Sequence, residues 1–557
     1  MVPISTGYVR RVTIGEMDLH PAVAERLARL APDQRAAATA PSGPSLCIAP
    51  AGSGKTTTLV ARAAWLIATG VPATSIRAIT FNTRAARELT ERLDAALDPL
   101  GVAAGAVRVR TFHALGREIL RDAGRPVEPV VDRTRILRDI APWADDTAVA
   151  RLDTFISRLK VGVGVPAGPV AADPEAGPFA RAYVAYERAV AALGGLDFDD
   201  LIIRAIAALS DDPALLGRWR ERCAELLVDE VQDVDERQLD LALLLAAPAN
   251  RIFLVGDDDQ SIYGWRLADV RRILGLEARL PGLRRVDLEV NYRCPAPVVE
   301  RAVRLVERNE ERFAKRIRAA PTAPGRLVLA PDPADDADAL ARVIATWPAD
   351  ESTRAILART NRELLPAVAV AIQLELPFRA PRLELPLASD GVDRLLDLAA
   401  EAVRADGRST LLALGRVRAT LADPADDALA SALLGWAVGL PTIEALRAAV
   451  MLARERLAQL RRDDAALTLA TAHATKGLEF DHVVVIGMVA GRFPSARAVT
   501  QADDPRRAYE EERRLAYVAW TRARRSLTLS YDPTVPSPFL LEAFETVELG
   551  LETTMAT

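Results

Sequence analysis

The sequence contains few cysteines, no long apolar run and no excess of positive charge. Its longest apolar runs, such as residues 432–440, are far shorter than the roughly 20 residues that a membrane-spanning helix requires. Residues 1–20 lack the apolar segment of a signal peptide. The cysteines are widely spaced and show no pairing typical of a metal site, which indicates a reducing compartment. They are Cys47, Cys223 and Cys294. We therefore expect a cytoplasmic protein that does not bind a membrane.

The balance of charge also limits the choice of partners. The 557 residues include 76 acidic and 71 basic side chains, which gives a net charge of −5. A strongly basic chain would have indicated general binding to nucleic acid, so any such partner must be recognised at local sites. The length and the 50% hydrophobic content allow about three to five domains with substantial cores.

A Gly-rich turn between a predicted strand and a predicted helix is the clearest functional signal. Residues 46–58 begin with a short apolar run and continue into a helical pattern. Gly52 and Gly54 allow successive backbone N–H groups to face inward, and the start of the helix adds a positive end, so the turn suits a phosphate group. In such a P-loop, Lys55 reaches the β- and γ-phosphates and the Thr56 hydroxyl binds Mg²⁺.

The turn departs from the usual P-loop pattern at Ala49, where a glycine is typical. A tight strand–helix turn with incidental glycines is the alternative explanation. It fits less well, because the glycines, the lysine and the threonine stand together in the expected strand–loop–helix context. We therefore predict nucleotide binding by the loop. The loop residues predicted to contact the nucleotide are Ala51, Gly52, Ser53, Gly54, Lys55, Thr56 and Thr57.

Aromatic and polar residues follow two further predicted strands, at residues 76–80 and 107–111. Phe81 and Asn82 come directly after the first strand, and His113 follows the second. Because ligands bind at the carboxyl ends of parallel strands, this placement predicts a ligand edge. Helix capping and packing are the alternative explanation.

The chain then becomes helical. Residues 116–209 keep an almost wholly helical pattern, which the Gly- and Pro-rich residues 162–177 interrupt. This pattern predicts a helical insertion with a mobile loop.

Two carboxylates follow the predicted buried strand at residues 226–228. Since an unpaired buried charge is costly, Asp229 and Glu230 at this position favour a functional role. Asp229 can hold Mg²⁺ through water, and Glu230 can orient and deprotonate an attacking water molecule.

The predicted strand at residues 252–255 leads into a polar loop with aromatic side chains. Gln260 is placed to sense the γ-phosphate of a nucleotide. Tyr263, Trp265 and Arg266 combine aromatic faces with a positive charge, a pattern typical of binding to single-stranded nucleic acid. A lone tryptophan is more often a core residue, but the polar, glycine-containing loop favours binding.

These segments resemble the motifs of the UvrD/Rep/PcrA family of superfamily 1A DNA helicases. Residues 229–233 and 256–266 resemble motifs II and III of that family. The other matches are Gln34 for the Q motif, residues 80–82 for motif Ia, 111–113 for motif Ib, 288–293 for motif IV, 473–480 for motif V and 511–523 for motif VI. Chance explains them poorly, because all of them stand in family order.

The resemblance implies an α/β fold with two RecA-like P-loop domains. Each domain has a parallel sheet flanked by helices and carries a helical insertion, and ATP is held between the domains. The insertion in the second domain is shortened relative to the longer members of the family. The expected parts are an N-terminal extension (1–29), domain 1A (30–115 and 197–285), insertion 1B (116–196), domain 2A (286–380 and 465–545), insertion 2B (381–464) and a C-terminal tail (546–557).

The resemblance also assigns residue roles. Gln34 and Tyr292 would hold the adenine, Glu479 the ribose hydroxyl, and Arg293 and Arg522 the γ-phosphate. The catalytic set is Lys55, Asp229, Glu230, Gln260, Arg293 and Arg522. The nucleotide-binding set adds Gln34, Tyr292, Gly477 and Glu479 to the loop residues and the two arginines. The metal ligands are Thr56 and Asp229, and the DNA-binding set is Phe81, Asn82, His113, Tyr263, Trp265 and Arg266.

Two features match no family pattern. Thr57 stands where family members often carry an arginine. His20 and His482 fall outside the motifs, and we expect them at the surface.

The implied function is an ATP- and Mg²⁺-dependent single-stranded DNA translocase and 3′-to-5′ DNA helicase. It would act on single strands and on junctions with duplex, in repair, recombination or genome defence. One alternative is a DNA-stimulated ATPase motor that unwinds only with a repair or nuclease partner. Others are a regulatory DNA-binding switch or an unrelated P-loop enzyme such as a kinase. Residues 256–266 argue against a kinase, and the complete catalytic set argues against an inactive ATP site.

Overall fold

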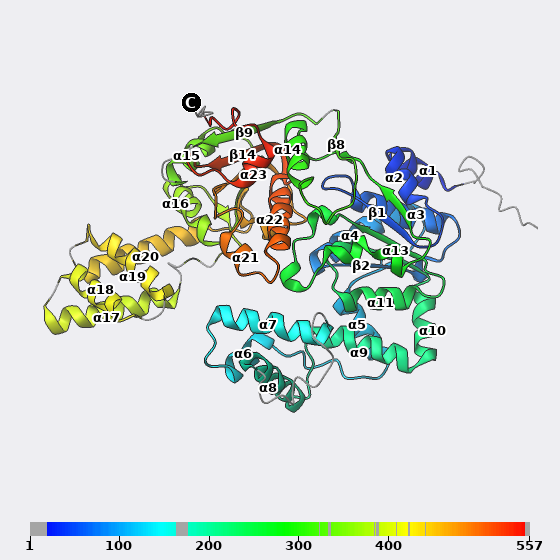
Figure 1. Cartoon of the computed structure of the whole chain (residues 1–557), viewed down its shortest axis with the longest axis horizontal. Coiled ribbons are helices and arrows are strands. Elements are labelled where there is room, and N and C mark those ends of the chain that lie inside the picture. Colours follow the sequence, from blue (N-terminus) through cyan, green and yellow to red (C-terminus); the bar gives the residue numbers. More distant parts are fainter. Residues whose placement is uncertain are drawn as a thin grey trace, which may run out of the picture. The chain divides into compact units, whose positions relative to one another are not determined.

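The computed structural model describes residues 19–162, 177–321, 323–331, 336–381, 383, 385, 389–407, 409–421, 424–440 and 442–551. The chain forms two compact units. Unit 1 contains the residues up to Tyr292 together with Asn309–Ala320, and unit 2 contains Arg293–Arg308 and the residues from Pro321 onward. Figure 1 shows both units and labels many of their elements.

Unit 1 is built on a six-stranded sheet with the order β3-β2-β4-β5-β1-β6, in which every pairing is parallel. Its four central strands, β2, β4, β5 and β1, are buried along their whole length, as expected for a parallel sheet covered on both faces. Alternate residues of β1 serve different faces: Leu46 and Ile48 pack into one core and Cys47 into the other. The strands are β1 (Ser45–Ile48), β2 (Ile76–Thr80), β3 (Arg108–Thr111), β4 (Glu225–Val228), β5 (Ile252–Gly256) and β6 (Arg284–Asp287).

Helices cover both faces of this sheet. One core contains residues of α5 (Phe112–Asp122), α9 (Phe198–Asp211), α10 (Pro213–Arg222) and α11 (Glu236–Ala246). The other contains residues of α1 (Pro21–Ala28), α2 (Pro32–Ala38), α3 (Lys55–Ala68) and α4 (Thr83–Leu97).

Three helices between α5 and α9 form an insertion with its own core. They are α6 (Arg133–Ile140), α7 (Asp146–Val161) and α8 (Pro178–Ala192). Leu137, Leu152, Ile156 and Tyr186 are completely buried among them. The loop predicted at residues 162–177 lies outside the described residues except for its two ends.

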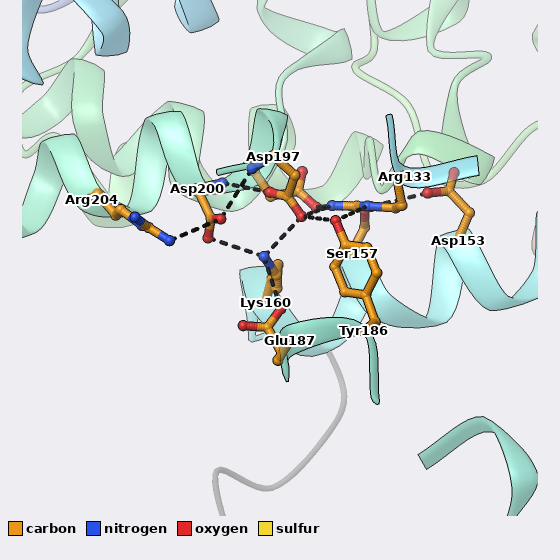
Figure 2. Close-up of polar contacts among 10 residues, drawn as sticks. Arg133, Asp153, Ser157, Lys160, Tyr186, Glu187, Asp197, Asp200 and Arg204 are labelled. Atoms are coloured by element: carbon orange, nitrogen blue, oxygen red, sulfur yellow. Dashed lines mark hydrogen bonds and ion pairs between the residues drawn. The ribbon is translucent and has the colours of Figure 1, made fainter. Parts of the chain in front are cut away.

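A buried polar network ties this insertion to α9, as Figure 2 shows. Arg133 donates hydrogen bonds to Asp197 at 2.6 Å and to Asp199 at 2.7 Å. Lys160 contacts Asp197 at 2.8 Å and Asp200 at 3.0 Å. Burial alone would raise the pKa of Asp197, but Arg133 and Lys160 hold it well below its usual range. The Asp197 carboxylate therefore stays ionised, and its contacts with Arg133 and Lys160 fix the insertion to α9.

Unit 2 contains a second six-stranded parallel sheet, with the order β11-β12-β10-β13-β14-β9. The helices α14 (Ala296–Val306), α15 (Asp336–Ala345), α16 (Leu365–Gln373) and α22 (Pro505–Trp520) belong to the same unit. The expected α/β class, with parallel sheets flanked by helices, is confirmed. The strands are β9 (Arg326–Pro331), β10 (Arg354–Ala358), β11 (Phe378–Arg379), β12 (Leu467–Thr471), β13 (Phe480–Val485) and β14 (Ala523–Tyr531).

Unit 2 also carries a helical insertion, formed by α17 (Asp390–Asp406), α18 (Thr410–Ala419), α19 (Pro424–Ala437) and α20 (Ile443–Leu460). These helices share one apolar core. The apolar end of α19 is divided between this core and solvent. Leu433 and Ala437 are buried, whereas Trp436 and Val438 are 44% and 74% exposed.

Three observations differ from the sequence-based expectations. Residues 1–29 were expected to be an extension, but α1 packs Val23 and Leu27 into the core of unit 1. His482 was expected at the surface; it is buried, and its ring contacts the Ser526 hydroxyl at 2.7 Å. The boundary expected at residue 285 also differs from the division into units, because Tyr292 and Asn309–Ala320 belong to unit 1.

Candidate nucleotide and nucleic-acid sites

The Gly-rich turn joins the end of β1 to the start of α3. Gly52 and Gly54 adopt positive φ angles of 69° and 84°, which side-chain-bearing residues rarely adopt. A Cβ atom at Gly54 would also lie only 2.6 Å from Nε2 of Gln34, so a side chain there would force Gln34 to move. These features fit the cradle that a phosphate group needs.

Gln34 supports this loop directly. Its Nε2 donates a 2.8 Å hydrogen bond to the carbonyl oxygen of Ser53, and its Oε1 accepts one from the backbone of Ala31. The backbone N–H of Tyr292 likewise donates to the carbonyl oxygen of Gly52 at 2.9 Å. The two residues expected to hold the adenine therefore both contact the loop.

Lys55 is paired with one of the predicted catalytic carboxylates. Its Nζ lies 2.9 Å from Oε2 of Glu230. Burial alone would lower the pKa of Lys55, but Glu230, Asp257 and Asp229 outweigh it and raise the value. The lysine is therefore charged, as phosphate binding requires.

Asp229 and Glu230 follow directly after β4. Burial and the adjacent Glu230 raise the pKa of Asp229 to about 7. Glu230 has a φ of 53°, in the left-handed region that a glutamate rarely adopts. Such strained positions cluster at functional sites.

A hydrogen-bonded series leads from Glu230 to the next strand end. Nε2 of Gln232 donates to Oε2 of Glu230 at 2.5 Å, and Oε1 of Gln232 accepts from the backbone of Asp257 at 3.0 Å. Asp257 then accepts a 2.7 Å hydrogen bond from Nε2 of Gln260. Gly256 leaves room for Gln232, because a Cβ atom there would lie 2.4 Å from its Oε1. Sequence reasoning missed Gln232, whose role depends on contacts between two strand ends.

Residues suited to hold Mg²⁺ stand at the same end of the sheet. Among the described residues, no group of three or more His, Cys, Asp or Glu side chains forms a ready metal site. Mg²⁺ in nucleotide sites usually takes one or two protein ligands together with phosphate oxygens and water. Thr56 at the start of α3 and Asp229 after β4 match such a set.

The remaining predicted nucleotide residues lie together in unit 2. Nε of Arg293 contacts Oε2 of Glu479 at 2.5 Å, and Arg524 pairs with the same carboxylate. Burial alone would raise the pKa of Glu479, but the two arginines hold it below its usual range. Arg522 is buried and donates to the carbonyl oxygens of Val518 and Leu478 at 2.8 and 3.1 Å. Gly477 adjoins this group with a φ of 82°.

The loops after β2 and β5 bring an aromatic series together. Phe81 and Tyr263 stack with their ring centroids 5.1 Å apart, and Tyr263 contacts Trp265 edge to face at 6.2 Å. The guanidinium carbon of Arg266 lies 4.7 Å from the Trp265 ring centroid. Trp265 is 54% exposed, so its ring is available to a nucleotide base.

The other two predicted DNA-binding residues have different surroundings. Oδ1 of Asn82 caps α4 by accepting from the backbone of Ala85, which is the capping explanation considered above. The half-buried His113 ring contacts Phe198 edge to face at 5.4 Å. Phe198 is 59% exposed, and sequence reasoning did not single it out. A phenylalanine flanked by Asp197 and Asp199 was the signal that the sequence offered.

Comparison with known proteins identifies the class. The chain matches the UvrD/REP helicase N-terminal domain over residues 30–281 and the UvrD-like helicase C-terminal domain over residues 439–534. The chain therefore belongs to the UvrD/Rep family, and it is an ATP-hydrolysing DNA helicase with RecA-like domains.

Individual relatives agree with this assignment. DNA helicase II of Escherichia coli (strain K12) is 29% identical, over 90% of this chain and 84% of the relative. ATP-dependent DNA helicase UvrD2 of Mycobacterium tuberculosis (strain ATCC 25618 / H37Rv) is 32% identical, over 91% and 79%. ATP-dependent DNA helicase Rep of Escherichia coli is 34% identical over 52% of this chain and 45% of the relative. Within the described residues, no helix has the length and apolar character needed to cross a membrane.

Proposed function

We propose that the protein is a single-stranded DNA translocase and 3′-to-5′ helicase that uses ATP with Mg²⁺. One observation carries the proposal. The hydrogen-bonded series from Lys55 through Glu230 and Gln232 ends at Gln260, in the same loop as Tyr263 and Trp265. A change at the nucleotide can therefore reach the loop that carries the aromatic series.

In this proposal, residues of unit 1 have separate roles in ATP binding and hydrolysis. Lys55 neutralises the β- and γ-phosphates, while Thr56 and Asp229 hold the Mg²⁺ ion. When bound, Mg²⁺ neutralises phosphate charge and orients the phosphates. Glu230 orients the attacking water and accepts its proton, and Gln260 senses the γ-phosphate.

Arg293 and Arg522 of unit 2 complete the set. Their role is to neutralise the charge that develops on the γ-phosphate during transfer. Loss of that phosphate after hydrolysis removes their ligand. Alternate gripping and release of the strand by the two units then moves the protein along DNA.

The proposed substrates are single-stranded DNA and its junctions with duplex, in repair, recombination or genome defence. A second candidate function is a DNA-stimulated motor that unwinds duplex only with a repair or nuclease partner. The exposed Trp436 and Val438 at the end of α19 favour it, because apolar side chains in solvent suit a partner surface. A regulatory DNA-binding switch is a third hypothesis, which requires little ATP turnover.

ATP hydrolysis with and without an oligodeoxythymidine strand tests the proposal. We expect strong stimulation by the strand and directional movement on it in a translocation assay. Equal turnover with and without the strand would contradict the translocase. Stimulated turnover with no strand separation would favour the partner-dependent motor, and weak turnover with tight DNA binding would favour the switch.

A further inference from the structure

A short segment of the chain clamps the loop that carries Gln260. This segment, Asn309–Ala320, is here called the strap. It belongs to unit 1, although the residues immediately before and after it belong to unit 2. Its end pairs in parallel with β7 (Val290–Asn291) through β8 (Arg318–Ala319).

The centre of the strap is a lysine whose side chain is only 1% exposed. Lys315 Nζ lies 2.8 Å from Asp257, 2.5 Å from Asp258 and 2.8 Å from Asp259. The side chains of all three aspartates are fully inaccessible to solvent. One ammonium group therefore contacts three consecutive carboxylates directly after β5.

A second cation and a backbone donor complete the clamp. Nε and one terminal nitrogen of Arg312 donate to the two oxygens of Asp259 at 3.0 and 2.9 Å. The backbone N–H of Phe313 donates to Asp258 at 2.8 Å. Burial alone would lower the pKa of Lys315, but the three carboxylates outweigh it and raise the value. The strap is thus fastened to this loop by charged contacts through its middle.

The same aspartates connect to the ATP residues. Oδ1 of Asp257 contacts Lys315, while Oδ2 accepts from Gln260 at 2.7 Å. The backbone N–H of Asp257 donates to Gln232, which in turn contacts Glu230. Each link is a direct contact, so displacement of the strap must disturb Asp257 or break the clamp.

A purely stabilising role explains the clamp poorly. Buried ion pairs are often no more stabilising than apolar residues of similar volume. The chain connectivity gives a better reason, since both ends of the strap are covalently joined to residues of unit 2.

We propose that Lys315 and Arg312 are positioning residues, which hold the Asp257–Gln260 loop in register with the nucleotide and couple its position to the movement of unit 2. This inference rests on the proposed function, because it concerns how DNA binding accelerates ATP hydrolysis. Neither residue is assigned a contact with ATP or DNA. Their effect is therefore on coupling between the two sites.

The test measures the ratio of ATP turnover with an oligodeoxythymidine strand to turnover without it, together with the Kd values for ATP and for the strand. We expect Arg312→Gln to lower this ratio at least tenfold while both Kd values stay within twofold of the wild-type values. Arg312→Lys should recover part of the ratio, because it keeps one charged contact with Asp259. Lys315→Arg keeps the charge but alters the three-carboxylate geometry, and should lower the ratio as well.

Arg316→Gln is the matched control, since this arginine lies exposed on the same strap; it should keep the wild-type ratio. If the strand does not stimulate ATP turnover by the wild-type protein, the proposed function itself is refuted. If the wild type is stimulated, a ratio within twofold of it in Arg312→Gln and Lys315→Arg overturns the inference. If ATP turnover with the strand, turnover without it and Tm all fall together, or if both variants fail to fold, the clamp is merely structural. Either result would also overturn the inference.

Discussion

The Lys55 ammonium group lies 2.9 Å from a carboxylate oxygen of Glu230, 175 residues away in the chain. This contact joins the residue expected to bind phosphate to the residue expected to activate water. In this contact each charge neutralises the other. Under the proposed function, Lys55 would turn toward the phosphates of ATP, and Glu230 would then be available to act as the base.

The first prediction separates binding from hydrolysis at this pair. Glu230→Gln removes the base but keeps a side chain of the same size, so ATP should still bind while turnover falls by about 10²–10⁴-fold, the usual contribution of general base catalysis. Lys55→Ala should abolish turnover and weaken ATP binding as well. Steady-state ATPase assays and equilibrium binding of ATP check both outcomes. Glu88→Gln, at an exposed position of α4, serves as the control; near-normal hydrolysis by Glu230→Gln would exclude this residue as the base.

The second prediction concerns the exposed ring of Trp265. Trp265→Ala should weaken single-strand binding by about 1–3 kcal/mol, or roughly 5- to 150-fold in Kd, because one base stack is lost. Fluorescence anisotropy with a labelled oligodeoxythymidine measures this change. Trp143 is equally exposed but lies in the first helical insertion, so Trp143→Ala is the matched control. Unchanged affinity in Trp265→Ala, together with unchanged ATPase stimulation, would make Trp265 a packing residue.

The third prediction concerns the two arginines that share Glu479. Arg293→Ala should reduce the DNA-stimulated kcat by about 10³-fold or more, since an arginine that stabilises phosphoryl transfer contributes ~10³–10⁵ in related chemistry. Arg524→Ala removes the other partner of Glu479, which is assigned no phosphate contact, and should have a much smaller effect. Stimulated ATPase rates of the two variants provide the comparison. Equal losses would mean that Arg293 acts only through the ion pair with Glu479.

The fourth prediction concerns the network in Figure 2. Arg133→Gln leaves Asp197 buried without its shortest ionic contact. The free energy of unfolding should therefore fall by about 3–5 kcal/mol near neutral pH. Because the folded-state pKa of Asp197 is lowered, the stability from this contact is present above the unfolded-state pKa and lost as pH falls through the folded-state value. The difference from wild type should therefore shrink in strong acid. Denaturant unfolding at several pH values measures it, and a pH-independent difference would contradict this origin.

Much of the fold could be predicted from local sequence. The strands at residues 76–80 and 252–255 match β2 and β5 closely, because buried parallel strands are short apolar runs bounded by turns. The two-residue strand β11 and the strand β12 were not predicted; β11 is too short to show any period. The helix α1 was missed since its eight residues bury only Val23 and Leu27.

Site residues could be predicted from the sequence where each belongs to a recognisable motif. The motifs indicate that Lys55, Glu230 and Gln260 take part in one reaction, but the sequence alone does not predict the contacts between them. Gln232 and Lys315 were missed because their importance comes from partners on other segments. Asn82 lies within a motif and was predicted to bind DNA; its Oδ1 caps α4, and the DNA contact stays a prediction.

The last prediction concerns duplex unwinding and the second helical insertion. Within the described residues, four helices, α17–α20, form the insertion of unit 2. Our hypothesis is that an insertion of this size would offer little surface to grip duplex DNA ahead of the junction. We therefore expect efficient movement on single strands but weak unaided unwinding of long duplexes, improved by a partner protein. Translocation and strand-displacement assays on one preparation compare the two activities.

Trp436→Ser with Val438→Ser should abolish stimulation by such a partner without changing translocation, because both residues lie outside the ATP and DNA sites described above. Processive unwinding of long duplexes by the purified protein alone would show that the small insertion is no handicap.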